Sequence, residues 1–303
     1  MAAAEYRSLL FSIAYGMTGS VSDAEDIVQD AFLGFTRALQ AGTVIVNAKA
    51  YLTTSVTRLG INVIRSARSG RESYVGEWLP EPVVELSDRL HPVEHAELTE
   101  SLSMAFLVLL ETLSPVERAV LVLREVFGYG YPDVARATGK SEANCRQILT
   151  RARKRIAAGR QETPGLPAPA RRAEGERLAR TFFDAAAGGD LNALLKMLAP
   201  EVVFYGDGGG RARAIKKPLT GSQRIVRLLI GGFNKLHTLG ASYQPARING
   251  RPGAVVYDAA QRVVSVIELH MVDEVVEAIH SVSNPDKLGH IGPVSDIGLL
   301  TQQ

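Results

Sequence analysis

The pattern of apolar and polar positions divides the chain into three segments. Between residues 5 and 71, apolar side chains recur every three or four positions, which predicts amphipathic helices. The stretch EWLPEPV (residues 77–83) breaks this pattern with two prolines, and helical spacing resumes from about residue 93 to residue 156. We therefore expect two helical segments joined by a connection that contains the prolines.

The third segment has a different character. It follows ETPGLPAPARR (residues 162–172), whose Pro, Gly and Ala content is typical of a linker. Helical patterns come first, and β-branched, partly alternating runs separated by turn residues come after them. These runs are EVVFYGDG, ASYQPARING, GAVVYDAA, RVVSVIELHMV and EVVEAIHSVS. Helices followed by a mostly antiparallel sheet predict an α+β domain.

Residues 114–156 carry the pattern of a helix, a short helix, a tight turn and a further helix. Ser114 and Pro115 suit the N-cap and the first position of a helix. Gly139 supplies the turn, and Ser141 is the expected cap of the last helix. This arrangement is that of a helix-turn-helix.

The last helix of this pattern has one apolar and one basic side. The apolar residues predict a buried stripe: Cys145, Ile148, Leu149, Ala152 and Ile156. The polar residues are predicted to face outward: Arg146, Gln147, Thr150, Arg151, Arg153 and Lys154. In the short helix before the turn, Val134 and Ala135 are predicted to face inward. Outward Arg and Gln can pair with guanine and adenine in the major groove, while the alternative is a solvated basic face on an ordinary bundle.

The composition restricts the possible functions but does not identify one. The 303 residues carry a formal net charge of only +2, so any nucleic-acid surface has to be a local basic patch. One cysteine excludes an internal disulfide, and we expect a cytoplasmic protein. Neither a signal peptide nor a membrane segment is predicted, and no metal or cofactor is expected. HPVEH (residues 91–95) is judged a chance match to a zinc-protease pattern, because Pro92 puts His91 at or before the start of a helix, so the two imidazoles do not share a helical face.

Two stretches carry a resemblance to a known family. The stretch GYGYPDVARATGKSEANCRQILTRARKR resembles region four of the extracytoplasmic-function sigma factors, and DAEDIVQDAF (residues 23–32) resembles region two. WLPEP, DGGG and NPDKL are similar to motifs of group 41 of this family, which carries a fused SnoaL-like domain. The implied fold is multidomain, with a helical bundle, a helix-turn-helix and a SnoaL-like, nuclear-transport-factor-2-like cone. The expected boundaries are 1–75 for region two, 76–95 for a linker, 96–160 for region four, 161–173 for a second linker, 174–290 for the cone and 291–303 for a tail.

The resemblance also implies partners and the residues that meet them. Core RNA polymerase is expected at Asp26, Gln29 and Asp30, with Phe32 and Phe35 packing inward. The next helix is expected to open and read the minus-ten element of promoter DNA through Arg58, Asn62, Arg65 and Arg68. In region four, the expected readers of the minus-thirty-five element are Arg146, Gln147, Thr150 and Arg151, with Arg153 and Lys154 on phosphates. This chain has Tyr51 where many members have Trp, and Arg58 where members often have Asn.

The cone domain is implied to regulate the attached sigma regions in cis, in place of a separate anti-sigma factor. The expected contact points are Trp78, Leu79, Pro80, Asp207, Gly208, Gly209, Gly210, Asn284, Pro285, Asp286 and Lys287. Filling a local core is the alternative for Trp78. We do not expect an enzyme, but a cone that binds or transforms an unknown small ligand stays open as a second hypothesis. Loose candidates for that chemistry are Asp184, Asp190, Tyr205 and His270. A one-component repressor would leave the region-two stretch unexplained.

Overall fold

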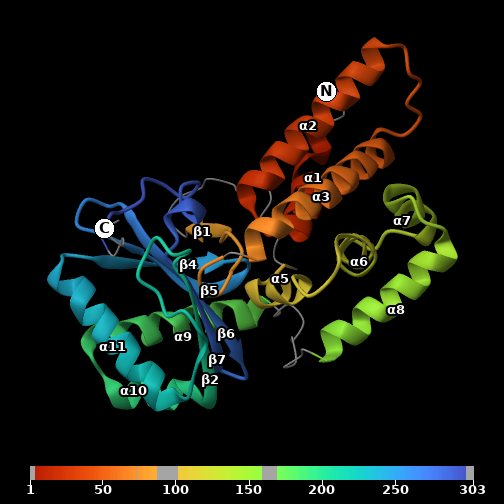
Figure 1. Ribbon diagram of the computed structural model, residues 1–303. Helices are drawn as coiled ribbons and strands as arrows, with labels where there is room; N and C mark the ends of the chain where they lie inside the picture. The colour runs from red at the N-terminus through yellow and green to blue at the C-terminus, as the bar shows by residue number, and fades with distance from the viewer. Residues whose placement is uncertain (1–3, 73, 87–101, 159–168, 298–303) are drawn as a thin grey trace. The chain divides into compact units, whose positions relative to one another are not determined.

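The computed structural model describes residues 4–72, 74–86, 102–158 and 169–297, and its contacts group into two units. The first unit contains residues 1–72 and 97–163, and the second contains residues 73–96 and 164–303 (Figure 1). We call residues 73–101 the connection and the second unit the tail unit. The HPVEH stretch (residues 91–95) lies outside the described residues.

The first unit is helical in both of its parts. Its N-terminal part contains η1 (Ala4–Tyr6), α1 (Arg7–Thr18), α2 (Val21–Gln40) and α3 (Ala48–Glu72). Its second part contains α5 (Met104–Leu110), α6 (Pro115–Leu121), η2 (Val122–Val126), α7 (Tyr131–Thr138) and α8 (Glu142–Ala158). The prediction of two helical segments is confirmed for the described residues, and residues 93–101 of the second predicted segment lie outside them.

The helix-turn-helix forms because local signals agree with the apolar pattern. The Ser114 hydroxyl accepts the Glu117 amide and the Glu117 carboxylate accepts the Ser114 amide, which closes a capping box at the start of α6. Gly139 ends α7 with a left-handed φ of 66°. The Ser141 hydroxyl then accepts the Asn144 amide at 3.2 Å and caps α8.

The core of this part follows the predicted stripe with one correction. The buried residues of α8 are Cys145, Ile148, Leu149, Ala152 and Ile156, as predicted. On α7, however, Val134 and Ala137 are buried, while Ala135 is only partly buried. The prediction for Ala135 is wrong because a three-residue step from Val134 brings Ala137 back to the same face.

One buried arginine joins α6 to α1. Arg118 is 2% exposed, and its guanidinium donates to the Met17 carbonyl at 2.6 Å. The same group forms an ion pair with Glu111 at 2.7 Å. Met17 also packs in an apolar cluster with Ile61 and Ala119, so the two helical parts share a core within the unit.

The tail unit is a single sheet with helices on one face. The helices are α9 (Pro169–Gly188), α10 (Leu191–Met197) and α11 (Ser222–Thr238), with η3 (Pro285–Lys287) after the last strand. The strands are β1 (Val84–Leu86), β2 (Leu198–Asp207), β3 (Leu219–Thr220), β4 (Ser242–Ile248), β5 (Arg251–Tyr257), β6 (Val263–Val272) and β7 (Val275–Val282). Their order is β1-β4-β5-β6-β7-β2-β3, and all neighbours are antiparallel except the parallel pair β2 and β7. The predicted α+β domain is confirmed.

The edge strand β1 comes from the connection. Val84, Glu85 and Leu86 pair with Ile248, Arg247 and Ala246 of β4. The connection therefore extends the sheet of the tail unit by β-strand addition.

In the described ranges, no helix combines the length and the apolar character needed to cross a lipid bilayer.

The turn glycine gives a test of the helix-turn-helix. Gly139 and Gly34 both have open space where a Cβ would lie, but only Gly139 has a positive φ. We expect Gly139→Ala to destabilise α7 and α8 by about 1 kcal/mol and the control Gly34→Ala to stabilise α2 by about 0.5–1 kcal/mol. Amide hydrogen exchange of the full chain measures both effects, and equal protection of α7 in wild type and Gly139→Ala would contradict the account.

Candidate promoter surface and linker clasp

The outward side of α8 is exposed and basic. Arg146, Gln147, Thr150 and Arg151 line one open groove on this helix. Each of these side chains is exposed, as are Arg153 and Lys154. The structure therefore brings the four predicted minus-thirty-five readers together on one face.

Two neighbours orient the first of these side chains. The Arg146 guanidinium pairs with the Glu142 carboxylate at 3.1 Å and lies 4.5 Å from the centre of the Tyr131 ring. The guanidinium of Arg124 lies 4.8 Å from the same ring. Exposed contacts of this kind contribute about 1 kcal/mol or less. They orient the Arg146 side chain but leave its guanidinium available to bind a ligand. Arg153 pairs with Glu125 at 2.8 Å.

Among the predicted minus-ten residues whose side chains are described, Arg58 contacts α7. The guanidinium of Arg58 on α3 donates to the carbonyls of Arg136 at 3.1 Å and Ala137 at 3.4 Å. These carbonyls lie at the end of α7, where the helix dipole attracts a cation. Asn62 and Arg65 are exposed. The side chain of Arg68 lies outside the described residues.

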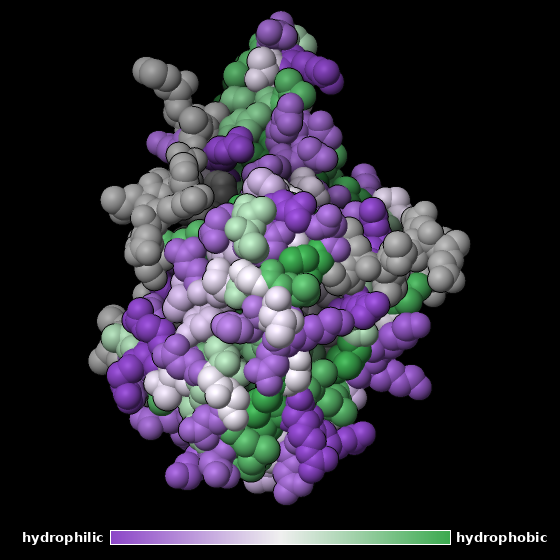
Figure 2. Space-filling model, turned by 90° about the vertical axis from the view of Figure 1, so that its left-hand side faces the viewer, coloured by the Kyte–Doolittle hydropathy of each residue, from purple (hydrophilic) through white to green (hydrophobic). Residues whose placement is uncertain are grey.

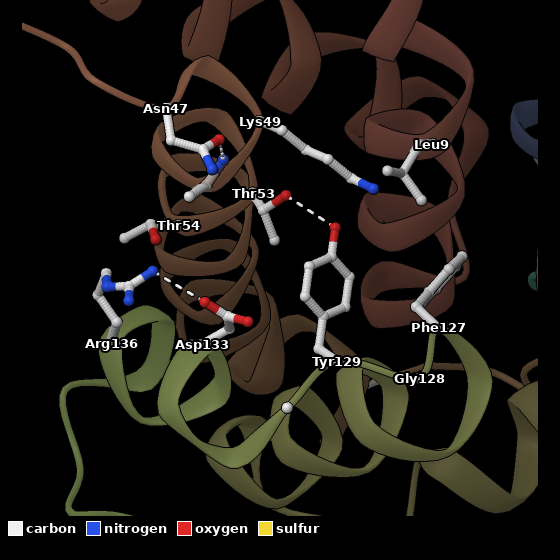
Figure 3. Close-up of a pocket in the computed structure, with 12 residues that line it drawn as sticks. Leu9, Asn47, Lys49, Thr53, Thr54, Phe127, Gly128, Tyr129, Asp133 and Arg136 are labelled. Atoms are coloured by element: carbon white, nitrogen blue, oxygen red, sulfur yellow. Dashed lines mark hydrogen bonds and ion pairs between the residues drawn. The ribbon is translucent and has the colours of Figure 1, made fainter.

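A polar pocket of about 370 Å³ continues this contact between α3 and the loop before α7 (Figure 3). The hydroxyls of Thr53 and Tyr129 are 3.0 Å apart across it, and the Lys49 ammonium lies 5.9 Å from the Tyr129 ring centre. The two helical parts of the first unit thus contact each other through polar side chains, and some of these belong to α3, the predicted minus-ten helix.

The acidic side of α2 is open to solvent. Asp26, Gln29 and Asp30 are all exposed on this helix. Phe32 and Phe35 are only partly buried, and the Phe35 ring meets the Tyr51 ring edge-on at 5.7 Å between centres.

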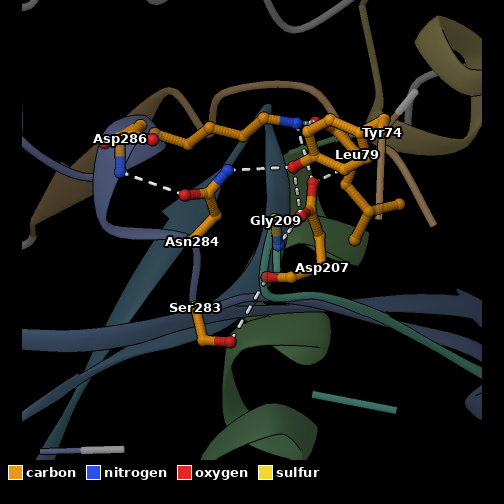
Figure 4. A network of polar contacts seen from close by, with 8 residues as sticks. Tyr74, Leu79, Asp207, Gly209, Ser283, Asn284 and Asp286 are labelled. Carbon is orange, nitrogen blue, oxygen red and sulfur yellow. Dashed lines mark hydrogen bonds and ion pairs between the residues drawn. The ribbon is translucent and has the colours of Figure 1, made fainter. Parts of the chain in front are cut away.

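In the tail unit, the most concentrated polar network is built around one carboxylate (Figure 4). Asp207 is fully buried at the end of β2. Its carboxylate accepts the Tyr74 hydroxyl at 2.5 Å, the Leu79 amide at 2.8 Å and the Lys287 ammonium at 2.7 Å. Buried charge is stable only when it is paired and hydrogen-bonded in this way.

Asn284 and Lys287 complete the network from the other side. The Asn284 side-chain amide donates to the Tyr74 oxygen at 2.9 Å. The Lys287 ammonium also donates to the Leu79 carbonyl and lies 4.3 Å from the Trp78 ring centre. We call Tyr74, Leu79, Asp207, Asn284 and Lys287 the linker clasp, because they fasten the connection to the tail unit. Burial and the Asp207 carboxylate both raise the pKa of Tyr74, so its hydroxyl remains a donor.

The glycines after Asp207 allow this close packing. A Cβ on Gly209 would lie 2.2 Å from the Asn284 amide nitrogen, and φ there is +58°. A Cβ on Gly208 would lie 2.3 Å from the Ala212 carbonyl oxygen. Gly210, with φ of +72°, packs against Val75 of the connection. Only glycine fits these positions.

The remaining predicted contact residues lie around the clasp. Trp78 is partly buried and stacks with the Lys287 ammonium, while Pro80 is buried. Pro285 begins η3. Asp286 is exposed and pairs with Arg211 at 2.5 Å.

The loose candidates for chemistry are not brought together. Asp184 accepts the Tyr243 hydroxyl, Asp190 caps α10, and Tyr205 stacks on the His280 ring. His270 is buried on β6, and burial lowers the pKa of its imidazole. Among the described residues, the predicted four form no acid–base pair with one another.

Sequence patterns missed three features of the tail unit. Tyr74 carries no local signal, because its importance comes from Asp207, 133 positions away. The strand β1 was detectable in the β-branched Val83 and Val84 after Pro82. His280 Nδ1 and Glu268 Oε2 form a buried pair 2.5 Å apart. Predicting this pair requires the register of β6 and β7, which the sequence alone does not give.

Comparison with known proteins agrees with this architecture of two helical regions, a helix-turn-helix and an α+β domain. Residues 3–70 match the family Sigma-70 region 2, and residues 103–156 match the family Sigma-70, region 4. Both regions in one chain define the class of the protein as a sigma factor, a non-enzymatic class that binds core RNA polymerase and promoter DNA to initiate transcription.

The relatives make the assignment more specific. The chain is 38% identical over 290 residues to the ECF RNA polymerase sigma factor SigJ of Mycobacterium tuberculosis, covering 93% of this chain and 90% of that protein. It is 32% identical to the probable ECF sigma factor SigI of the same organism, over 65% of this chain and 66% of that one. The crystal structure of SigJ matches with a TM-score of 0.76 and 33% identity, covering 96% of this chain and 98% of the other. The chain therefore belongs to the extracytoplasmic-function sigma factors, with a SnoaL-like, nuclear-transport-factor-2-like C-terminal domain.

The linker clasp predicts a local change on removal of its central charge. Asp207→Ala leaves the Lys287 ammonium buried without its carboxylate, which costs about 3 kcal/mol, or about a hundredfold in an equilibrium. We expect the Leu79 amide to exchange at least about tenfold faster, as measured by hydrogen exchange.

The matched control for this variant is Asp296→Asn. Asp296 also lies in the tail unit, but its ion pair with Arg262 is exposed. Exposed pairs contribute little, so the Leu79 amide should keep its wild-type exchange rate. Equal exchange rates of the Leu79 amide in Asp207→Ala and wild type would contradict the claim that Asp207 holds the connection in the tail unit.

Proposed function

We propose that Asp26, Gln29 and Asp30 on α2 bind core RNA polymerase. An exposed acidic helix face suits a basic partner surface, which supports this assignment. Arg58, Asn62, Arg65 and Arg68 on α3 contact the minus-ten element. On α8, the base readers are Arg146, Gln147, Thr150 and Arg151, and the phosphate contacts are Arg153 and Lys154.

We further propose that the tail unit regulates these regions in cis. The linker clasp carries this proposal, because it places part of the connection between regions two and four within the tail unit. A tail that holds its own connection needs no separate anti-sigma factor, and the chain acts without enzymatic chemistry.

The length of the connection explains how such a clasp can regulate. The minus-ten and minus-thirty-five elements lie about 25 base pairs apart, or about 85 Å along B-DNA. The 29 residues from 73 to 101 can span about 100 Å when fully extended. Residues 74–86 are fixed in the tail unit by the clasp and by β1, so their span is set by that fold and not by full extension of the chain. Holding the connection therefore restrains the separation that promoter binding requires.

The Arg58 contact supports a closed form from within the first unit. While its guanidinium is bonded to the end of α7, its Nε–H and one Nη2–H are not available to DNA. The Arg118 contact also joins region four to region two. This contact has to break before each region reaches its own promoter element. The clasp is expected to favour this closed form over the polymerase-bound one.

Run-off transcription tests the direction of this regulation. Core RNA polymerase is combined with the full-length chain on promoters selected from a random library. We expect Asp207→Ala to raise initiation by about fivefold or more, a typical size for a coupling between two states. Asp296→Asn should match wild type. Unchanged or lower initiation by Asp207→Ala, with wild type active, would overturn inhibition by the clasp.

Region four gives an independent prediction. Arg146→Ala should cost about 1–3 kcal/mol of promoter affinity and relax base preference at one position of the minus-thirty-five element. Lys154→Ala should weaken all sequences alike and lower the salt slope of binding by about 1. Binding titrations of the holoenzyme across salt concentrations and promoter variants measure both, and the reverse pattern would contradict the assigned roles.

A further inference from the structure

A cavity of about 520 Å³ lies between α11 and the sheet of the tail unit. Its walls are mainly apolar and include Phe204 of β2, Leu229 and Phe233 of α11, and Ile267 of β6. Volumes of 300–1,000 Å³ with apolar walls are typical of small-molecule sites. Figure 2 faces the side on which α11 lies in Figure 1, and it shows apolar residues emerging within a polar surface.

The polar groups of the cavity favour an anion. Arg213 and Lys235 line it and are exposed, so they lie towards its mouth. No Asp, Glu or His is among the lining residues, and neither cation has an ion pair within the described residues. The hydroxyls of Ser265 and Ser281 add hydrogen-bonding groups between the apolar walls. An apolar body with one carboxylate would complement this arrangement, whereas a polar or cationic molecule would not.

The wall of the cavity is also the support of the linker clasp. Gly206 lines the cavity, and the next residue, Asp207, points to the opposite face of the sheet because side chains alternate along a strand. Ser283 also lines the cavity, and both its amide and its hydroxyl donate to the Asp207 carbonyl, at 2.8 and 3.2 Å. The cavity and the clasp thus lie on opposite faces of the same two strand ends.

The segment that carries Arg213 gives a second connection. The Ala212 amide donates to the Gly208 carbonyl at 2.9 Å. Ile215 packs so closely on Gly206 that a Cβ there would lie 3.0 Å from its side chain. A ligand that holds residues 212–215 against the sheet would therefore also hold the glycine turn after Asp207.

We propose that the cavity binds an apolar carboxylic acid and that the bound acid strengthens the linker clasp. The carboxylate pairs with Arg213 and Lys235, and the apolar body packs on Leu229, Phe233 and Ile267. The regulatory half of this inference rests on the proposed function, whereas the binding half does not. By linkage, an acid that strengthens the clasp binds more weakly when the clasp is broken.

Calorimetric titration of the full-length chain with decanoate tests binding without polymerase. We expect saturable binding, and Arg213→Glu should raise the Kd at least about tenfold by replacing attraction with repulsion. Arg224→Glu is the matched control, because Arg224 is exposed on α11 but does not line the cavity. Decanol, which lacks the charge, should bind more weakly than decanoate. No saturable binding, or equal Kd values for Arg213→Glu and Arg224→Glu, would overturn the site.

The coupling has its own readout in the single tryptophan of the chain, Trp78, which lies against Lys287 of the clasp. Decanoate should change Trp78 fluorescence with the same Kd as the calorimetric signal. Asp207→Ala should weaken decanoate binding about fivefold or more, although Asp207 does not line the cavity. Decanoate that binds wild type and Asp207→Ala equally would overturn the coupling. In that case, run-off transcription by Asp207→Ala would still test the regulatory function separately.

Discussion

The buried carboxylate of Asp207 is the interaction on which the arrangement of the tail unit depends. A charge without solvent contact has to be matched by donors, and three of its donors come from Tyr74, Leu79 and Lys287. Two of these residues belong to the connection, so satisfying the charge also fixes the connection. Loss of one partner leaves another polar group buried, which makes release of the clasp costly and cooperative.

In the function proposed above, this constraint links the tail unit to transcription initiation. Promoter elements fix how far apart regions two and four have to be, and in the proposed regulation a connection that is fixed in the tail unit cannot extend fully to span that separation. Arg58 shows the same opposition inside the first unit, where carbonyls of α7 occupy a guanidinium proposed for DNA. Under this proposal, the free energy of a polar network in the tail unit regulates a surface that binds DNA in a different unit.

Much of the fold was predictable because local signals and apolar periodicity agreed. The capping residues Ser114 and Ser141, the turn at Gly139 and the stripe from Cys145 to Ile156 all stand where the sequence places them. The prediction that Ala135 faces inward was wrong. On a helix of only eight residues, an error of one or two positions changes which residue is assigned to the buried face. The family motifs identified Asp207, Asn284 and Lys287 as residues of interest. Tyr74 and the role of Gly209 depend on atoms more than 70 positions away, and no local pattern reveals them.

The distance between regions two and four tests the central claim most directly. Labels are attached to Gln40→Cys and Lys140→Cys in a Cys145→Ala background, because both sites are exposed and the native thiol is buried. Distances are then measured by electron spin resonance in free wild type, in Asp207→Ala and in promoter-bound holoenzyme. The account predicts one short distance in wild type, added longer distances in Asp207→Ala, and a long distance on the promoter. Identical distributions in wild type and Asp207→Ala, or a free wild type already at the promoter-bound distance, would contradict it.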